Sequence, residues 1–132
     1  MTATRRPTIL VVDDEEDVVT FLTTLLADNG YATITARDGA EALARVRADH
    51  PDLVTLDITM PSQSGVRTYR ELKADPVLAR IPVIIVTGID KEFEQFISTR
   101  HQVPPPEGYI SKPIDKDRLL ALVQTLLSTT GP

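Results

Sequence analysis

Residues 8–14 read Thr8-Ile-Leu-Val-Val-Asp13-Asp14, a short β-branched apolar run that ends in two acids. A continuous apolar run of this length is typical of a strand buried on both faces of a parallel sheet. The pattern recurs in Asp52-Leu-Val-Thr-Leu-Asp57, and Ile81–Thr87 is the most β-rich segment of the chain. We therefore predict a sheet whose buried strands end in polar residues.

The segments between these strands carry the spacing of amphipathic helices. After the first strand, apolar residues at positions 18, 21, 22, 25 and 26 form one helix face, and Gly30 is placed to end that helix. Further strands are expected at Tyr31–Ala36 and Gly108–Ser111. The other helices are expected within residues 40–49, around Val66, Tyr69 and Leu72, around Phe93, Phe96 and Ile97, and from Leu119 to Leu127 with Asp115 as N-cap.

Five strands that alternate with five helices indicate an α/β fold in which helices cover both faces of a parallel sheet. A chain of 132 residues is too short for an eight-unit barrel. We therefore predict the flavodoxin-like (βα)5 fold with strand order 2-1-3-4-5. One domain is expected over residues 8–128, with short tails at 1–7 and 129–132.

The composition excludes several classes of function. The 42% hydrophobic and 25% charged residues are typical of a globular domain with a packed core. The absence of cysteine excludes disulfides, a thiolate nucleophile and Cys-ligated metals. A net charge of -5 argues against direct nucleic-acid binding. No signal peptide or membrane span is recognisable, so we expect a cytoplasmic location and no membrane partner.

Polar residues stand at the ends of four of the expected strands. They are Asp13, Asp14, Asp57, Thr87 and Lys112. In the predicted order these strands are neighbours about 4.8 Å apart, so their carboxyl ends meet in the crevice where such sheets bind ligands. Carboxylates about 5 Å apart repel by roughly 3 kcal/mol per pair at an effective dielectric near 20, which favours recruitment of a cation. With oxygen donors alone, the expected ion is Mg2+, with Mn2+ as the alternative.

This constellation suits phosphoryl transfer. A carboxylate beside a bound Mg2+ ion can attack phosphorus in line and form an aspartyl phosphate, and Asp57 is the candidate nucleophile. The Lys112 ammonium would neutralise the transferred group, and the Thr87 hydroxyl would donate a hydrogen bond to one of its oxygens.

Five motifs in order resemble the signature of response-regulator receiver domains, over about Ile9 to Leu127. They are Asp13-Asp14, Asp57-x-x-Met60-Pro61, Gly65, Thr87-Gly88 and Lys112-Pro113. The resemblance implies a phosphoacceptor switch of a two-component system or phosphorelay, whose phosphoryl donor is a histidine kinase or a histidine phosphotransfer protein. It implies a signalling domain that catalyses its own phosphorylation and dephosphorylation and is not otherwise an enzyme.

The same resemblance assigns roles to individual residues. Asp14, Asp57 and the backbone carbonyl of Thr59 would coordinate the metal, and Asp13 would act mainly through water. Gly88 would join Thr87 and Lys112 around the phosphoryl group. The Lys112–Pro113 peptide would be cis, which proline permits at modest cost.

Tyr109 matches the aromatic switch position of the family, which moves together with Thr87. A plain packing role for Tyr109 stays open. By this resemblance, phosphorylation alters the face built from the helix around 93–97, the strand at 108–111 and the helix at 119–127. A downstream protein, or a second copy of the chain in a phosphorylation-dependent homodimer, would bind there.

The sequence departs from the family pattern beside that face. Gly88 stands where alanine is usual, and the connector from His101 to Gly108 contains Pro104–Pro106 and is longer than normal. The connector is either a spacer or a partner-docking element. Thr59 and Ile89 occupy positions that set how quickly the phosphoryl group is lost, and since neither is charged we expect a long-lived switch.

Two other functions are weighed against this one. An aspartate-nucleophile phosphohydrolase would resemble Asp-x-Asp at the nucleophile, whereas Asp57-Ile58-Thr59 lacks the second acid and no cap domain is recognisable. A receiver-like module that takes no phosphate is disfavoured because every chemical residue is present. Residues 128–132 form a short polar tail, so we expect the domain to act through partners unless the chain is an excised piece. The sequence names neither the cognate kinase nor the target.

Overall fold

The structure is a computed structural model that describes residues 6–58, 64–87 and 107–129. It contains a five-stranded parallel sheet in the order β2-β1-β3-β4-β5, which confirms the predicted topology. The strands are β1 (Thr8–Val12), β2 (Ala32–Ala36), β3 (Leu53–Asp57), β4 (Val83–Thr87) and β5 (Gly108–Ser111).

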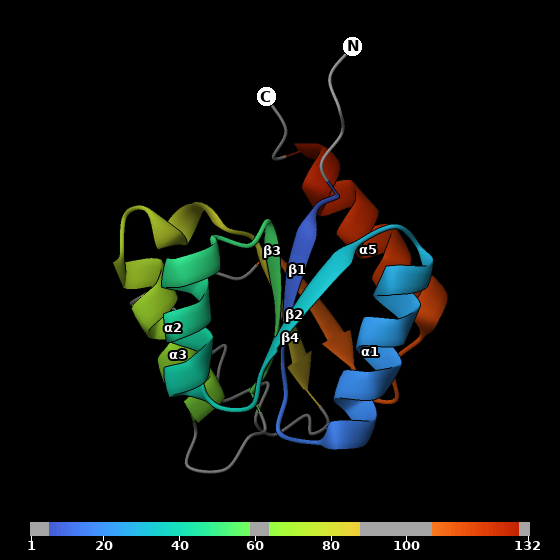
Figure 1. The fold of residues 1–132 in the computed structure, drawn as a ribbon, viewed down its shortest axis with the longest axis horizontal. Coiled ribbons are helices and arrows are strands. Elements are labelled where there is room, and N and C mark those ends of the chain that lie inside the picture. The colour runs from blue at the N-terminus through green and yellow to red at the C-terminus, as the bar shows by residue number, and fades with distance from the viewer. Residues whose placement is uncertain (1–5, 59–63, 88–106, 130–132) are drawn as a thin grey trace.

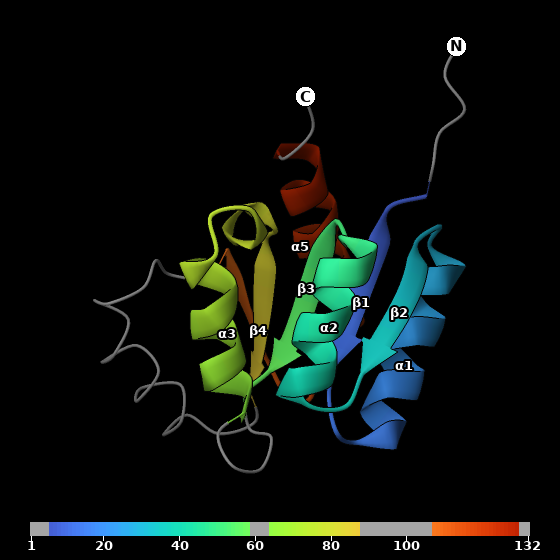
Figure 2. The ribbon, with the colours of Figure 1, turned by 60° about the vertical axis from the view of Figure 1, so that its left-hand side comes forward.

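Helices cover both faces of this sheet, as predicted. They are α1 (Glu16–Asp28), α2 (Gly39–Asp49), α3 (Ser64–Ala74) and α5 (Lys116–Thr129), together with a short 3-10 helix, η2 (Leu78–Arg80), that was not predicted. Helices α1 and α5 lie on one face of the sheet and α2 and α3 on the other (Figures 1 and 2). The expected helix around Phe93, Phe96 and Ile97 lies outside the described residues.

Alternate residues of the central strands build two separate cores. Leu10, Val54 and Ile85 belong to the cluster under α2 and α3. Ile9 and Ile84 belong to the cluster under α1 and α5. Because both faces of these strands are buried, their sequences are nearly continuous apolar runs, interrupted within β3 only by the buried Thr55, instead of alternating with polar residues.

Local signals in the sequence define the element boundaries. Gly30, with φ +93, adopts the left-handed conformation that follows α1. The Asp115 carboxylate accepts hydrogen bonds from the backbone N–H groups of Asp117 and Arg118, at 3.0 and 3.1 Å, and so caps α5 as predicted. Strand β4 begins at Val83, two residues later than expected, and the carbonyl of Pro82 accepts a hydrogen bond from the Val54 N–H.

A buried ion pair fastens the start of β5 to α3. The Lys73 side chain is 2% exposed, and its ammonium lies 3.1 Å from a Glu107 carboxylate oxygen. The ammonium also donates to the carbonyl oxygens of Ala79 and Ile81, both at 3.2 Å. Glu107 Oε1 in turn accepts a hydrogen bond from the backbone N–H of Val83 at 2.7 Å. This pair was not predicted from the sequence.

Among the described helices, none combines the length and the hydropathy that crossing a bilayer requires.

Candidate functional site

The sheet register brings the acids at the ends of β1 and β3 together. Val12 of β1 pairs with Leu56 of β3, so the next residues, Asp13 after β1 and Asp57 at the end of β3, lie side by side. On the other side of β3, Asp57 pairs with Val86, and Thr87 pairs with Ser111 one step further along. Lys112 follows Ser111 and therefore emerges at the same edge.

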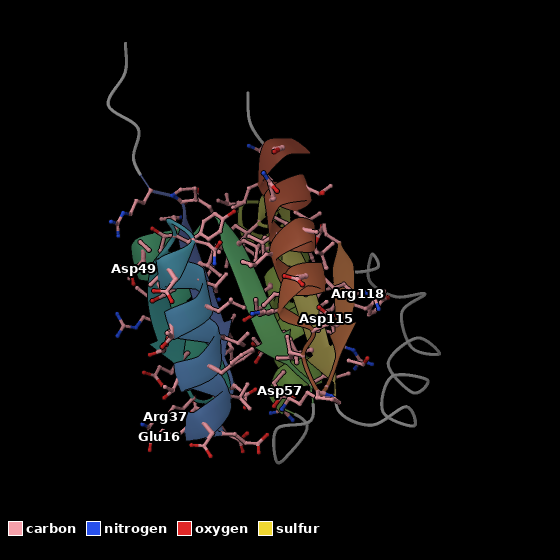
Figure 3. The ribbon with its side chains drawn as sticks, turned by 90° about the vertical axis from the view of Figure 1, so that its right-hand side faces the viewer. Glu16, Arg37, Asp49, Asp57, Asp115 and Arg118 are labelled. Atoms are coloured by element: carbon pink, nitrogen blue, oxygen red, sulfur yellow. The ribbon has the colours of Figure 1, made fainter. Side chains whose placement is uncertain are left out.

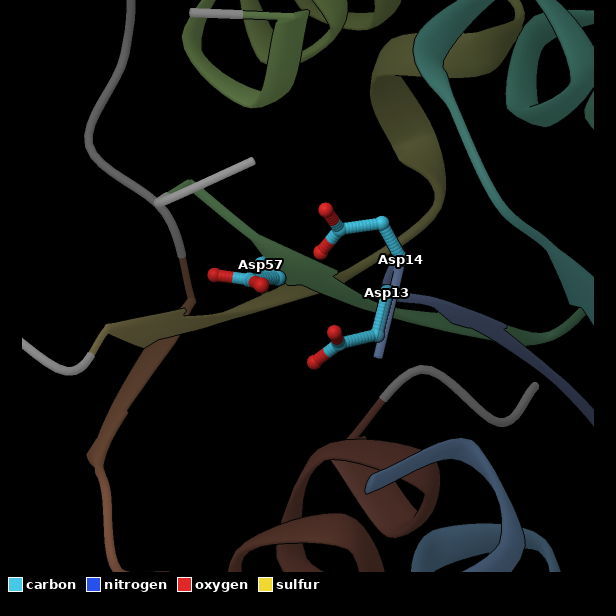
Figure 4. Close-up of side chains that lie close together, drawn as sticks. All are labelled: Asp13, Asp14 and Asp57. Carbon is cyan, nitrogen blue, oxygen red and sulfur yellow. The ribbon is translucent and has the colours of Figure 1, made fainter. Parts of the chain in front are cut away.

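Three carboxylates meet at this edge. Oxygen atoms of Asp13, Asp14 and Asp57 all lie within 4.8 Å of one another. Figure 4 shows the three side chains gathered at the carboxyl ends of β1 and β3. Asp13 and Asp57 are each 1% exposed, whereas Asp14 faces solvent. This donor set contains oxygen only and is open to water on one side, so it fits a hard divalent cation such as Mg2+.

Among the described residues, Lys112 is the basic side chain that contacts the aspartate cluster. Its ammonium lies 3.4 Å from Asp57 Oδ2 and 3.4 Å from Asp13 Oδ2. Its shortest contact, 2.9 Å, is with Oε1 of Glu15. The Lys112–Pro113 peptide bond is cis, the geometry that the resemblance implies.

The electrostatic state of the edge follows from burial and from the number of acids. Burial is the largest cause that raises the pKa of Asp13 from 3.8 to about 6, and the charge of Asp57 adds to it. Burial would lower the pKa of the Lys112 ammonium, but the hydrogen bond with Glu15 and the charges of Asp57 and Asp13 raise it overall. Among the described residues, Lys112 therefore faces more carboxylates than one ammonium can neutralise.

Other predicted site residues are placed only in part. Thr87 is the last residue of β4, and its side chain is not among those described. Thr59, Gly88 and Ile89 lie outside the described residues, so the roles predicted for them stay predictions, and the same holds for the Pro104–Pro106 connector. Tyr109 is half-buried and packs against the core under α2 and α3.

Sequence reasoning missed Glu15, which was interpreted only as part of a solvated first helical turn. Its backbone N–H donates to Asp13 Oδ1 at 2.9 Å, and its carboxylate contacts Lys112 across 97 positions of sequence. The only signal for this contact was its place directly after the Asp13-Asp14 pair.

The fold and the site define a flavodoxin-like α/β domain with a compact cluster of aspartates and a lysine at the carboxyl edge of its sheet. The chain matches the family model of the response regulator receiver domain over residues 9–124 and belongs to that family. It is therefore a receiver domain of two-component signalling.

Individual relatives agree with this assignment. Protein PilH of Pseudomonas aeruginosa is 34% identical over 120 residues, which cover 91% of this chain and 97% of PilH. The alkaline phosphatase synthesis transcriptional regulatory protein PhoP of Bacillus subtilis is also 34% identical over 90% of this chain, which spans 48% of PhoP. The signal receiver domain of an HD domain-containing protein from Pseudomonas fluorescens superposes with a TM-score of 0.85 at 28% identity, covering 98% of this chain and 93% of that one.

Proposed function

We propose that this receiver domain is a phosphoacceptor switch in which Asp57 takes a phosphoryl group from the phosphohistidine of a histidine kinase or phosphotransfer protein. The observation that carries the proposal is the buried Asp57 carboxylate, which lies within 4.8 Å of the Asp13 and Asp14 oxygens and 3.4 Å from the Lys112 ammonium. Asp13, Asp14 and Asp57, with the backbone carbonyl of Thr59, would hold Mg2+. The domain is proposed to extend over residues 8–128.

The chemical step transfers one phosphoryl group between two nucleophiles. An Asp57 carboxylate oxygen forms the new P–O bond as the P–N bond of the phosphohistidine breaks, and the imidazole nitrogen leaves with the electron pair. Bound Mg2+ supplies positive charge that offsets the carboxylates and the phosphoryl oxygens. The Lys112 ammonium is close enough to Asp57 to pair with the transferred group, and the Thr87 hydroxyl would donate a hydrogen bond to it. We propose that the domain also catalyses the later hydrolysis of this acyl phosphate.

The phosphoryl group is proposed to act on a protein-binding face. β5 runs directly into Lys112, and its Tyr109 packs on the core, so this strand would connect the site to the side of the molecule that carries α5. By the family resemblance the face would also include residues around 93–97, which lie outside the described residues. A downstream protein, or a second copy of the chain, would recognise the phosphorylated form there. The net charge of -5 favours a protein partner over nucleic acid.

Phosphoryl uptake from a small donor tests the proposal. The chain is incubated with acetyl phosphate and Mg2+, and its intact mass is measured with and without EDTA. We expect the mass of one added phosphoryl group, its loss in hydroxylamine, which cleaves acyl phosphates but not phosphoserine or phosphothreonine, and no addition to Asp57→Asn. An unmodified wild-type chain, or equal labelling of Asp57→Asn, would refute the assignment.

A further inference from the structure

Glu15 is an ion-pair partner of Lys112 that lies outside the aspartate cluster. Glu15 lies between β1 and α1 in an extended conformation, with φ -92 and ψ 115. The hydrogen bond from its N–H to Asp13 fixes its backbone next to the aspartate cluster. Its Oε1 is 2.9 Å from the Lys112 ammonium, closer than the 3.4 Å that separates this ammonium from either Asp13 or Asp57.

The three acids that contact Lys112 differ in solvent exposure, and therefore in how easily water or another anion can displace their contact with the ammonium. The Glu15 side chain is 62% exposed, whereas Asp13 and Asp57 are each 1% exposed. An ion pair at the surface contributes little because water replaces either partner readily. The shortest contact of Lys112 is therefore also the one that an incoming anion can displace most easily.

We propose that Glu15 is a positioning residue that holds Lys112 away from the transferring phosphoryl group and slows phosphoryl uptake until that group displaces it. The inference rests on the proposed function, in which Lys112 pairs with the phosphoryl group. The Lys112 ammonium has three donors, so it must give up at least part of its contact with Glu15 to pair with an additional dianionic group. Glu15 thus competes with the phosphoryl group for the same lysine.

Glu15→Gln separates the charge of Glu15 from its shape. Glutamine keeps the oxygen acceptor at the same length, but it removes the negative charge and with it the ion pair with the Lys112 ammonium. We expect phosphoryl uptake from acetyl phosphate with Mg2+ to be about two- to fivefold faster in Glu15→Gln than in the wild type, the range that an exposed ion pair permits.

Glu16→Gln is the matched control. It removes the same charge one residue away, from a side chain that is 80% exposed and pairs with Arg37 at 3.3 Å. Glu16 and Arg37 lie near the same end of the molecule as Asp57 (Figure 3). We expect the uptake rate of Glu16→Gln to equal that of the wild type. Equal acceleration of both variants would assign the effect to general charge and overturn the proposal, as would an unchanged or slower rate in Glu15→Gln.

A second readout needs neither metal nor phosphoryl donor. In a double-mutant cycle of Glu15→Gln and Lys112→Met, urea unfolding of the metal-free chain should show coupling. The unfolding equilibrium constant of the double variant should differ about two- to fivefold from the product of the single effects. The cycle of Glu16→Gln with Lys112→Met should show none. Absence of coupling in the first cycle would overturn the inference.

The two readouts distinguish the failure of this inference from the failure of the proposed function. If no form of the chain accepts a phosphoryl group at Asp57, the proposed function fails, and the positioning role fails with it even where the cycle shows coupling. If the wild type is phosphorylated and the cycle shows coupling but Glu15→Gln is not faster, the contact is structural and only the positioning role is refuted.

Discussion

The Lys73–Glu107 ion pair predicts that the loss of its two partners will have unequal effects on stability. Glu107→Ala removes the carboxylate that lies 3.1 Å from a Lys73 ammonium whose side chain is 2% exposed, and it also removes the acceptor of the Val83 N–H. Lys73→Met instead removes the buried charge. The remaining Glu107 side chain is 34% exposed, so water can solvate it while it keeps its bond to Val83.

The expected loss of stability in each variant depends on which charged or polar groups remain without a partner. Removing one partner of a buried pair costs about 3–5 kcal/mol, because the other charge stays buried and uncompensated. Lys73 keeps the carbonyl oxygens of Ala79 and Ile81 as acceptors, so we take the lower end, about 3 kcal/mol, for Glu107→Ala. In Lys73→Met these two carbonyl oxygens each lose a hydrogen bond worth roughly 1 kcal/mol, and the packing of the methionine offsets part of this loss. We therefore expect Lys73→Met to lower the free energy of unfolding by about 1–2 kcal/mol.

Urea unfolding measures both changes in free energy. The linear extrapolation requires that the slope of the free energy against urea stays the same among the variants. Lys116→Met, at an exposed position in the first turn of α5, controls for the loss of a lysine charge and should change stability by less than about 0.5 kcal/mol. A Lys73→Met variant less stable than Glu107→Ala would refute the reasoning.

Three further results are expected. The raised pKa of Asp13 means that the folded, metal-free chain binds more protons than the unfolded chain between about pH 4 and pH 6, so its stability falls as pH rises through this window. Asp13→Asn should abolish this loss, which is at most about 3 kcal/mol, and a pH series of urea midpoints that is the same in both proteins would contradict the assignment. Asp115→Ala should destabilise the chain by about 1 kcal/mol in the same assay, because two N–H groups of α5 lose their cap, whereas an unchanged midpoint would argue against the cap. The uncharged Thr59 and Ile89 predict a long-lived phosphoryl group, and release of labelled phosphate within seconds would count against it.

The fold was predictable because each central strand is buried on both faces. Residues Ile9 to Val12 are 0–1% exposed and divide between two cores, so the apolar run contains no polar interruption. The boundary of β4 was not predictable in the same way. Ile81 was assigned to β4 because it opens the most β-rich segment of the sequence. In the structure it packs against the core but precedes the ladder. The helix η2 has three residues, too few for a periodic pattern to indicate it.

The site was predictable only where backbone register determines it. The proximity of Asp13 to Asp57 follows from the pairing of β1 with β3 and therefore from strand order alone. The contact of Glu15 with Lys112 depends on the reach of two long side chains, and an acid at the start of a helix is usually interpreted as a partner of the helix dipole. The same limit concealed the pairing of Lys73 with Glu107.

β5 is preceded by an acid that pairs with a buried lysine and followed by a lysine that contacts several acids. This difference limits which movements of β5 can transmit the effect of phosphorylation. At its beginning, Glu107 forms a buried pair with Lys73, whereas at its end the Lys112 ammonium stands among Asp13, Asp57 and Glu15. Only the four residues Gly108–Ser111 separate these two points. A strand anchored at one end and hydrogen-bonded to β4 along its length would resist sliding if Lys112 moves, as proposed, toward a phosphoryl group.

We therefore expect side chains of β5, above all Tyr109, to transmit the change while the backbone of the strand stays in register. NMR of the chain with and without the phosphoryl group tests this. The Tyr109 ring resonances should shift, while amide hydrogen exchange at Val83 and Ile110 should stay unchanged. Faster exchange at both amides would mean that the Lys73–Glu107 anchor releases on phosphorylation, and the strand would then have to move as a whole.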